Sequence, residues 1–430
     1  MPITAVIGAQ WGDEAKGKIT DNFAQKADMV IRATGGNNAG HTVVNEFGTR
    51  ALHLVPVGIF NPDADCIIGP GTAVNPPSLW EEMEDVKKAG ASLERLFISP
   101  KAHLTMFWHI MQDVAEEKRR GDKGKIGTTL RGIGPTYADQ AARIGLRVAD
   151  LQDIHAAKAK FKELFELKRK YLILMYSRSA GFTTFAEFWK DIEVYASCLA
   201  PFIRDTDKMT WDAMDAGKSI LIEGAQGLIL DILHGFYEGV TSTGCTLAAL
   251  AQGASIDPRK IDRVIGVIRA FLTRVGTGPF PTEASQDIAA MLRERGHEYG
   301  ATTGRPRRCG WLDLVLLRYA HRLCGFTEFA LTKADCLAGI PEIPVGVAYS
   351  RYGQVSNSGE YATEFPMHEL ANFKPLYIYQ NGWEEDLSLC ENWGSFPQAF
   401  KDYIHLIEQF TGVFVRYVST GPKRDQLVIR

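Results

Sequence analysis

The feature that most constrains the fold is a strand pattern followed at once by a glycine loop. Residues 3–7 form an apolar run typical of a buried strand. Residues 12–19, GDEAKGKI, then match the GxxxxGK pattern of a phosphate-binding loop. Ile19 replaces the Ser or Thr that would help hold Mg²⁺, and two acids, Asp13 and Glu14, lie inside the loop. Because an acid beside a polyanion is unfavourable unless it binds a metal or exchanges a proton, we expect Asp13 or Glu14 to replace that hydroxyl, and also to act as a base.

Strand-like and helix-like patterns alternate along the rest of the 430 residues. Strands are expected at 29–32, 66–68, 219–222, 264–268 and 328–331. Helices are expected at 79–86 and 102–119 and through a helix-rich insertion at roughly 77–217. This alternation predicts a single α/β domain over residues 1–430, with a large, mainly parallel central sheet and helices on both faces. The basic runs at 158–160 and 168–170 are interpreted as a solvated helix face.

Composition excludes several functional classes. The net charge of -3 predicts neither a nucleic-acid-binding surface nor a basic membrane face. The first residues lack the positive charge of a signal peptide, and no apolar run of about 20 residues is present. Seven cysteines without a CxxC pair indicate reduced thiols rather than disulfides or zinc, and hence a cytoplasmic protein.

Three further loops carry groups that bind anions. Residues 35–42, GGNNAGHT, combine glycines with asparagine and histidine side chains. Residues 127–135, GTTLRGIGP, offer hydroxyl and backbone N–H groups, and Arg143 and Arg147 downstream are placed one above the other on a helix. Residues 301–308 contain three arginines, whose guanidinium groups suit a carboxylate or a phosphate.

Two segments predict recognition of a purine base. Residues 329–335, FALTKAD, place T-K-x-D at a strand end, as in the guanine-reading element of GTP-binding proteins. A carboxylate there accepts from the N1–H and exocyclic amine of guanine, a donor pair that adenine lacks. Residues 223–227, EGAQG, follow the strand at 219–222, where open α/β sheets bind ligands, and Gln226 is positioned to contact a base edge.

Together these motifs resemble the adenylosuccinate synthetase family over nearly the whole chain. The segments that carry the resemblance occur in order: QWGDEAKGK at 10–18, GGNNAGHT at 35–42, GTTLRGIGPTYAD at 127–139, EGAQG at 223–227, TRVGTGPFPTE at 273–283, ATTGRPRRCGWLD at 301–313, LTKAD at 331–335 and STGPKRD at 419–425.

The resemblance implies a P-loop-like GTP-binding architecture with a helical insertion, working as a cytoplasmic homodimer. It implies GTP-dependent ligation of L-aspartate to IMP in AMP biosynthesis, giving adenylosuccinate, GDP and phosphate through a 6-phosphoryl-IMP intermediate. Asp13 would take the N1 proton of IMP, and His41 and Gln226 would complete the catalytic set. Mg²⁺ would be held by Asp13 and the carbonyl of Gly40. Arg143 would reach the site of the partner subunit.

The family motifs also imply the remaining contacts. GTP would be bound by Gly12, Asp13, Glu14, Ala15, Lys16, Gly17, Lys18, Gly40, His41, Thr42, Arg307, Lys333, Ala334, Asp335, Ser419, Thr420 and Gly421. IMP would be bound by Asp13, Asn38, Ala39, Gly40, His41, Thr129, Arg143, Gln226, Thr241 and Arg305. Aspartate would be bound by Ala301, Thr302, Thr303, Gly304, Arg305 and Arg307.

The chain departs from the family pattern at three places. Ala15 replaces a usual glycine, so its backbone is expected to avoid positive φ. Gln140 stands where a lysine is usual, and residues 236–245 differ beside the IMP site although Thr241 is kept. Two other functions therefore remain open: the same ligation on dGMP, and a GTP-binding regulatory module without ligase activity.

Overall fold

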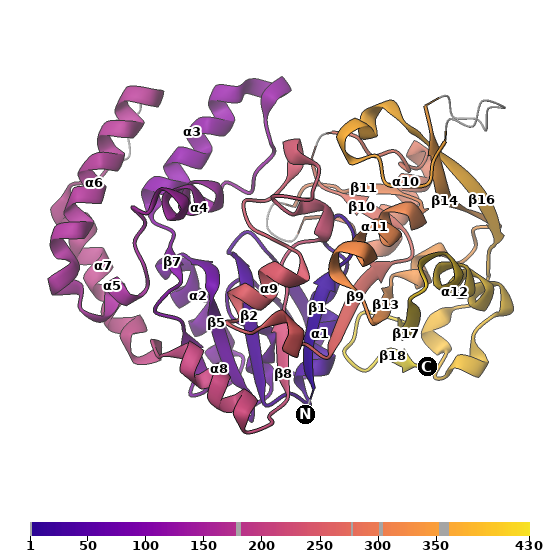
Figure 1. Cartoon of the computed structure of the whole chain (residues 1–430), viewed down its shortest axis with the longest axis horizontal. Coiled ribbons are helices and arrows are strands. Elements are labelled where there is room, and N and C mark those ends of the chain that lie inside the picture. Colours follow the sequence, from indigo (N-terminus) through magenta and orange to yellow (C-terminus); the bar gives the residue numbers. More distant parts are fainter. Residues whose placement is uncertain (1, 178–181, 277, 301–303, 352–360) are drawn as a thin grey trace.

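The central sheet of the computed structural model, which describes residues 2–177, 182–276, 278–300, 304–351 and 361–430, contains ten of the strands in those ranges. Its main path runs β18-β17-β13-β9-β1-β8-β2-β5-β6, and β7 also pairs with β5 (Figure 1). The strands are β18 (Leu427–Ile429), β17 (Phe414–Ser419), β13 (Glu328–Thr332), β9 (Arg263–Arg269), β1 (Ile3–Gly8), β8 (Ile220–Glu223), β2 (Met29–Gly36), β5 (Asp65–Val74), β6 (Leu96–Ile98) and β7 (His103–Leu104). All pairings are parallel except that of β17 with β18, which confirms the mainly parallel sheet.

Strand β1 lies in the middle of this sheet and is buried along its whole length. Ile3, Ala5 and Ile7 join one hydrophobic core, whereas Val6 joins the core on the opposite face. This alternation follows from the period-two geometry of a strand. The sheet is therefore covered on both faces, as the apolar run of β1 predicts.

Helices from different parts of the chain form the two covering layers. One face carries α8 (Thr206–Asp215), α9 (Leu247–Gly253), α10 (Gln286–Gly296), α11 (Leu314–Cys324) and α12 (Gln398–Thr411). The other carries α1 (Lys16–Ala24), α2 (Pro76–Lys88), α3 (Phe107–Gly124), α6 (Ile154–Tyr176) and α7 (Phe185–Leu199). The short helices α4 (Ile133–Ala142) and α5 (Ala149–Gln152) lie beside α3 and α6 (Figure 1).

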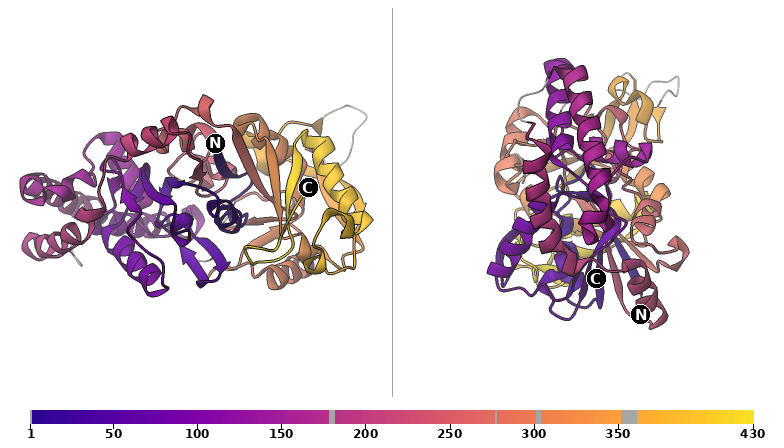
Figure 2. Two further views of the ribbon diagram at one scale, coloured as in Figure 1. Left: turned by 90° about the horizontal axis from the view of Figure 1, so that it is seen from below. Right: turned by 90° about the vertical axis from the view of Figure 1, so that its left-hand side faces the viewer.

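The long helices α3, α6 and α7 extend at one end of the molecule, and a small sheet lies at the other (Figure 2). That sheet joins β12 (Leu312–Asp313), β14 (Glu342–Ser350), β15 (Tyr361–Ala362) and β16 (Lys374–Asn381). Two hairpin-like pairs, β3 (His41–Asn45) with β4 (Gly48–Leu52) and β10 (Leu272–Arg274) with β11 (Arg308–Gly310), border the site described below. Short 3₁₀ turns are found at Val57–Phe60, Ala200–Phe202, Leu228–Leu230, Tyr237–Gly239, Pro258–Lys260, Ala334–Leu337, Met367–Asn372, Leu387–Leu389 and Trp393–Ser395.

Two local expectations in the helical region were wrong. The helix expected at 102–119 begins at Phe107, because His103 and Leu104 form β7 and pair with β5. Lys168, expected on a solvated face, is buried and forms an ion pair with Asp139 of α4, since α6 packs this part of its basic run inward. A search of the helices in the described ranges found none long and apolar enough to span a membrane.

Candidate active site

The predicted ligand-binding segments meet at one edge of the central sheet. Loops at the carboxyl ends of β1, β2, β8, β13 and β17 carry residues 12–15, 37–40, 224–227, 333–335 and 420–421. Because parallel strands present their carboxyl ends at the same edge, segments distant in sequence lie together there (Figure 1). This is the edge at which open α/β sheets bind ligands.

The loop between β1 and α1 is held in an unusual backbone conformation. Gly12, Asp13 and Ala15 have φ values of 88°, 59° and 65°. The expectation that Ala15 avoids positive φ was therefore wrong: it adopts the left-handed conformation as the N-cap of α1. The carbonyl of the preceding residue, Glu14, accepts a 2.9 Å hydrogen bond from the Thr332 hydroxyl, which fixes the chain at the turn. An alanine tolerates this geometry at a penalty of about 1 kcal/mol.

The two acids of this loop have different surroundings. The Glu14 carboxylate is fully buried, accepts hydrogen bonds from the backbone N–H groups of Gln10 and Gly12 at 3.1 and 2.8 Å, and pairs with the Lys16 ammonium at 2.6 Å. The side chain of Asp13 is 37% exposed, and its Oδ2 lies 2.9 Å from Nε of Arg307. Glu14 thus stabilises the loop from inside, and Asp13 is the acid that faces the site.

Lys18 joins the phosphate-binding loop to the predicted GTP-binding residues at the end of β17. Its ammonium donates to the Ser419 hydroxyl at 2.6 Å and to the carbonyls of Gly421 and Gln426 at 2.5 and 2.6 Å. Burial lowers the pKa of Lys18 to about 8, although the nearby Asp335 opposes this shift. The side chain therefore connects the start of α1 to the segment that follows β17.

His41, at the start of β3, belongs to a buried charged network. The Glu223 Oε1 atom lies 2.6 Å from His41 Nδ1 and 2.5 Å from Nη1 of Arg32. Its Oε2 accepts from the N–H of Val57 at 2.9 Å. Burial and the neighbouring Arg32 lower the pKa of His41 to about 4. Burial alone would raise the pKa of Glu223, but His41 and Arg32 outweigh it and lower that pKa to about 2.

Gln226 presents both of its amide atoms to this part of the site. Its side-chain oxygen and nitrogen are buried without a hydrogen-bond partner among the described residues, and so is the side-chain oxygen of the nearby loop residue Asn38. Gln226 also has a positive φ of 55°, which directs it over Gly35. A Cβ on Gly35 would lie 3.3 Å from the Gln226 Oε1 atom and 2.7 Å from Ala225, so only glycine fits there. Buried amide groups of this kind are suited to reading a base edge.

The loop at 126–132 contacts Arg305. The Nη2 atom of Arg305 donates to the carbonyl of Gly127 at 3.1 Å, and Thr129 lies half-buried two residues further on. The expectation that the loop amides bind an external anion needs correction. Several of these N–H groups donate to carboxylates of α3, Glu117 and Asp113, because the loop folds back on that helix.

Arg143 and Arg147 do not stack on one helix, contrary to expectation. Helix α4 ends at Ala142, and Arg143 is its C-cap with a left-handed φ of 62°. Both arginines are exposed, and the N–H of Arg147 donates to Asp150 at 2.7 Å before α5. Gln140 is also exposed, two residues before the end of α4. Gln140 and Arg143 therefore both lie on the molecular surface, at the C-terminal end of α4.

The predicted guanine-binding residues lie on two neighbouring strands. Lys333, Ala334 and Asp335 follow β13, and Ser419 ends β17, which pairs with β13 in parallel. The ammonium of Lys333 donates to the carbonyl of Gly296 at 2.8 Å. Thr420 is buried beside Ser419, and the parallel pairing places residues 333–335 and 419–421 at the same ends of neighbouring strands.

Sequence analysis missed Glu298, which follows α10. This fully buried carboxylate pairs with Arg269, with Nη1 of Arg307 at 2.8 Å and with Nζ of Lys333 at 3.8 Å. Burial opposes its ionisation, but Arg269 and the other two cations lower its pKa below the usual value. We call Glu298, Arg269, Arg307 and Lys333 the Glu298 cluster. Only a weak signal in the sequence points to Glu298, because it is a lone acid three residues before the arginine-rich loop at 301–308.

The aspartate-binding prediction lies partly outside the described residues. Ala301, Thr302 and Thr303 are not among them. Gly304 is exposed with a φ of 65°, and Arg305 and Arg307 are half-buried beside it. Thr241 is half-buried, and its N–H donates to the Leu230 carbonyl at 2.8 Å.

The divergent segment 236–245 is joined through Arg274 to Trp11, the residue before the phosphate-binding loop. The Arg274 guanidinium lies between Trp11 and Phe236, 4.4 and 5.5 Å from the ring centroids. The N–H of Cys245 donates to Asp231 at 2.6 Å, so the changed residues are held in place.

The carboxylate of Asp13 is suitable for Mg²⁺. This cation usually takes one or two protein oxygens and completes its shell with water and substrate phosphates. The half-exposed carboxylate of Asp13 matches that requirement, and the described residues contain no group of three or more His, Cys, Asp or Glu side chains that would form a closed metal cage.

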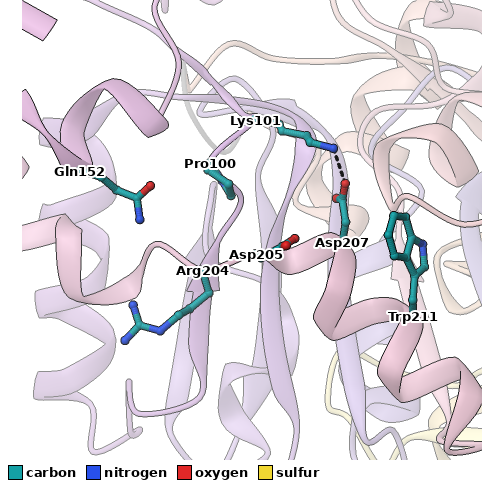
Figure 3. Close-up of a pocket in the computed structure, with 7 residues that line it drawn as sticks. All are labelled: Pro100, Lys101, Gln152, Arg204, Asp205, Asp207 and Trp211. Carbon is teal, nitrogen blue, oxygen red and sulfur yellow. Dashed lines mark hydrogen bonds and ion pairs between the residues drawn. The ribbon is translucent and has the colours of Figure 1, made fainter. Parts of the chain in front are cut away.

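A surface cavity of about 450 Å³ lies apart from this site (Figure 3). It is lined by Pro100, Lys101, Gln152, Arg204, Asp205, Asp207 and Trp211. Lys101 pairs with Asp207, whose other oxygen accepts from Ser255 at 2.7 Å. None of the predicted site residues lines it, and its charged groups are partnered, so we assign it no role.

Known proteins resemble the chain over its full length. The family model described as adenylosuccinate synthetase matches residues 5–428. The adenylosuccinate synthetase of Thermoanaerobacter sp. (strain X514) is 44% identical over 431 residues, covering 100% of this chain and 99% of that protein. The fully ligated adenylosuccinate synthetase of Plasmodium falciparum superimposes with a TM-score of 0.93 at 35% identity, and 100% of each chain is covered. The succinoaminodeoxyadenylate synthetase of cyanophage S-2L, bound to dGMP and dATP, shares the fold at a TM-score of 0.62 and 20% identity, over 100% of this chain and 95% of that one.

Proposed function

The chain belongs to the adenylosuccinate synthetase family, and from this premise we propose how its residues carry out the reaction. The protein is a GTP-dependent ligase that joins L-aspartate to IMP in purine biosynthesis. The observation that carries the assignment of its catalytic base is the contrast between Glu14, buried inside the loop, and Asp13, which faces the site.

Activation of IMP is the chemical problem that the site must solve. The 6-oxo group of a purine is a poor leaving group, so it has to be phosphorylated before an amine displaces it. In our proposal Asp13 takes the N1 proton of IMP, and O6 then attacks the γ-phosphorus of GTP and releases GDP. The amine of aspartate displaces phosphate from the resulting 6-phosphoryl-IMP, and Gln226 orients the purine through its two amide atoms.

His41 stabilises the transferring phosphoryl group. Without bound triphosphate its imidazole is neutral, because burial and Arg32 lower its pKa to about 4. A triphosphate beside the ring favours the charged form, since an anion raises the pKa of a neighbouring histidine. Glu223 then accepts a hydrogen bond from Nδ1–H, and Nε2–H donates to the phosphoryl oxygens.

A bound Mg²⁺ would neutralise phosphate charge during the transfer. Asp13 and the carbonyl of Gly40 would hold it. Arg307, which pairs with Asp13 at 2.9 Å, is positioned to contact the same phosphate group or the carboxylates of aspartate.

GTP and IMP would bind on the two sides of Asp13. Residues 12–18, 40–42 and 307 would contact the GTP phosphates, and residues 333–335 and 419–421 the guanine, with Asp335 accepting its N1–H and amine protons. Asn38, Thr129, Thr241 and Arg305 would bind IMP, and residues 301–305 with Arg307 would bind aspartate.

The protein would act as a cytoplasmic homodimer, with residues 1–430 folding as one domain. Pairing of β1 with β8 and β9, and of β13 with β17 near the C-terminus, supports a single folding unit. All seven cysteines are free, which suits a reducing compartment. The exposed turn at Arg143 supports donation of this residue to a partner subunit.

Subunit mixing tests the trans contact. Arg143→Leu and Asp13→Asn variants should each be inactive alone, and the mixed dimer should regain about a quarter of wild-type turnover when half of the dimers are hybrid and each hybrid has one intact site. No recovery on mixing would contradict donation of Arg143 between subunits.

A nucleotide assay tests the reaction. We expect phosphate release from GTP that requires both IMP and aspartate, and no release with dGMP in place of IMP. Turnover with dGMP alone would transfer the assignment to 2-aminodeoxyadenylosuccinate synthesis. A rate of GTP hydrolysis that does not change on addition of IMP and aspartate would instead indicate a GTP-binding regulatory module. The identities of 35% and 44% to adenylosuccinate synthetases favour IMP.

A further inference from the structure

Two carboxylates of α3 hold the loop at 126–132. Oε1 of Glu117 accepts from the N–H of Ile126 at 3.1 Å, and its Oε2 accepts from the N–H groups of Gly127 and Thr128 at 2.8 and 3.3 Å. One turn earlier on the helix, Oδ2 of Asp113 accepts from the N–H of Gly132 at 3.0 Å and its Oδ1 from the hydroxyl of Thr128 at 2.8 Å. Both side chains are buried, with 7% exposure each.

The same peptide units connect this loop to Arg305. Gly127 donates its N–H to Glu117 and accepts from Nη2 of Arg305 at 3.1 Å through its carbonyl. Gly127 has a φ of 81°, so its two polar groups point in the directions that both partners need. A displacement of the loop from Glu117 would therefore displace the Arg305 guanidinium as well as Thr129.

We propose that Glu117 and Asp113 are positioning residues for the nucleotide monophosphate: they fix the loop so that Thr129 and Arg305 face IMP. Neither carboxylate contacts substrate itself. The inference rests on the proposed function, because it takes IMP as the ligand beside Thr129 and Arg305.

The two acids should respond differently to conversion into amides. Both oxygens of Glu117 accept from N–H groups, so Glu117→Gln turns a donor toward at least one backbone donor. Asp113 accepts from one N–H and one hydroxyl, and a hydroxyl can also accept. Asp113→Asn therefore keeps both contacts, with its oxygen at Gly132 and its amide nitrogen at Thr128, whereas Asp113→Ala loses them.

The test compares these variants in the full-length enzyme. The matched control is Glu116→Gln, which alters the neighbouring acid on the outer face of α3, where it pairs with Arg119 and Arg120. Titration calorimetry gives the Kd of IMP, phosphate release gives kcat and the KM values of IMP and GTP, and thermal unfolding reports folding.

We expect Glu117→Gln and Asp113→Ala to raise the Kd and KM of IMP about tenfold to a hundredfold, with the KM of GTP within about twofold of wild type. Asp113→Asn and Glu116→Gln should stay within about threefold for IMP.

The inference is overturned if Glu117→Gln and Asp113→Ala behave like Glu116→Gln in an enzyme that turns over IMP. It is also overturned if the KM values of IMP and GTP rise together, because that pattern would mean a general structural defect. Should Glu117→Gln fail to fold, the contrast between Asp113→Ala and Asp113→Asn decides. A wild-type enzyme that does not use IMP would overturn the proposed function first.

Discussion

At the scale of single residues, the donors around each carboxylate decide what it does. Glu14 is surrounded by backbone N–H groups and Lys16, and Glu223 by His41 and Arg32. Both carboxylates are buried and hydrogen-bonded, so they hold the neighbouring backbone and side chains in place. Asp13 has one guanidinium partner and is partly exposed, which leaves it able to exchange a proton with a ligand.

Asp13→Asn should abolish turnover and keep the fold. Asparagine tolerates the φ of 59° at this position but cannot act as a base, so we expect kcat to fall by about a hundredfold or more. Phosphate-release kinetics and thermal unfolding check the two parts of this prediction. A variant with full turnover would show that Asp13 is not the base.

Acid should destabilise the protein through His41. Its pKa is about 4 in the folded protein against about 6.5 for an unperturbed histidine, so unfolding takes up a proton between these values. The stabilisation is complete above pH 6.5 and is lost as the pH falls toward 4, by on the order of 3 kcal/mol.

Urea unfolding at pH 7.5, 5.5 and 4.5 measures this loss, with His41→Gln as the reference. Other buried histidines contribute equally to both proteins, so the difference between them isolates His41. Equal pH slopes for the two proteins would mean that His41 has the same pKa in the folded and unfolded states, which would contradict the prediction. Below pH 4.5 protonation of Glu223, whose pKa is about 2, adds a second loss.

At the scale of elements, the turn from β1 into α1 combines three left-handed residues in four positions. Sequence analysis located this element because an apolar strand and a glycine loop are adjacent in the chain. It failed on the conformation of Ala15, since the tertiary contact from Thr332 to Glu14 joins residues far apart in sequence. The tertiary contact thus outweighs the preference of an alanine for negative φ.

Ala15→Gly should stabilise the protein. Removal of the Cβ relieves the left-handed penalty at a φ of 65°, and we expect a gain in the free energy of unfolding of up to about 1 kcal/mol. Urea denaturation gives the value. Ala89→Gly is the matched control, because Ala89 has a right-handed φ of -73° and glycine there should be neutral or destabilising. Equal effects of the two substitutions would contradict the argument.

At the scale of the whole molecule, long-range charge pairs join loops that the sequence keeps apart. The mainly parallel sheet and the motifs at its edge were predictable, because each strand and loop has a local pattern. The strand order, the contact of Lys18 with Ser419 and the Glu298 cluster were not, because their partners lie on different strands or loops and no local periodicity encodes them.

Glu298→Gln should lower global stability and GTP affinity together. Loss of this carboxylate leaves the guanidinium of Arg269, which is 1% exposed, without its carboxylate partner, a situation that typically costs about 3 to 5 kcal/mol. Urea unfolding and the KM of GTP are the measurements. Glu294→Gln, at an exposed position of α10, is the control and should change neither. An unaltered stability of Glu298→Gln would show that the cluster does not need its central charge.

The central position of β1 also has a consequence during synthesis of the chain. Ile3 pairs with Ile220 and Thr4 with Arg263, so β1 finds its neighbours only after about 200 further residues have been made. At roughly 5 to 20 residues per second this apolar segment waits some 10 to 40 seconds without a partner. Because an unpaired apolar strand is prone to aggregation, the yield of this protein in the cell should respond to translation speed more than its final stability would suggest.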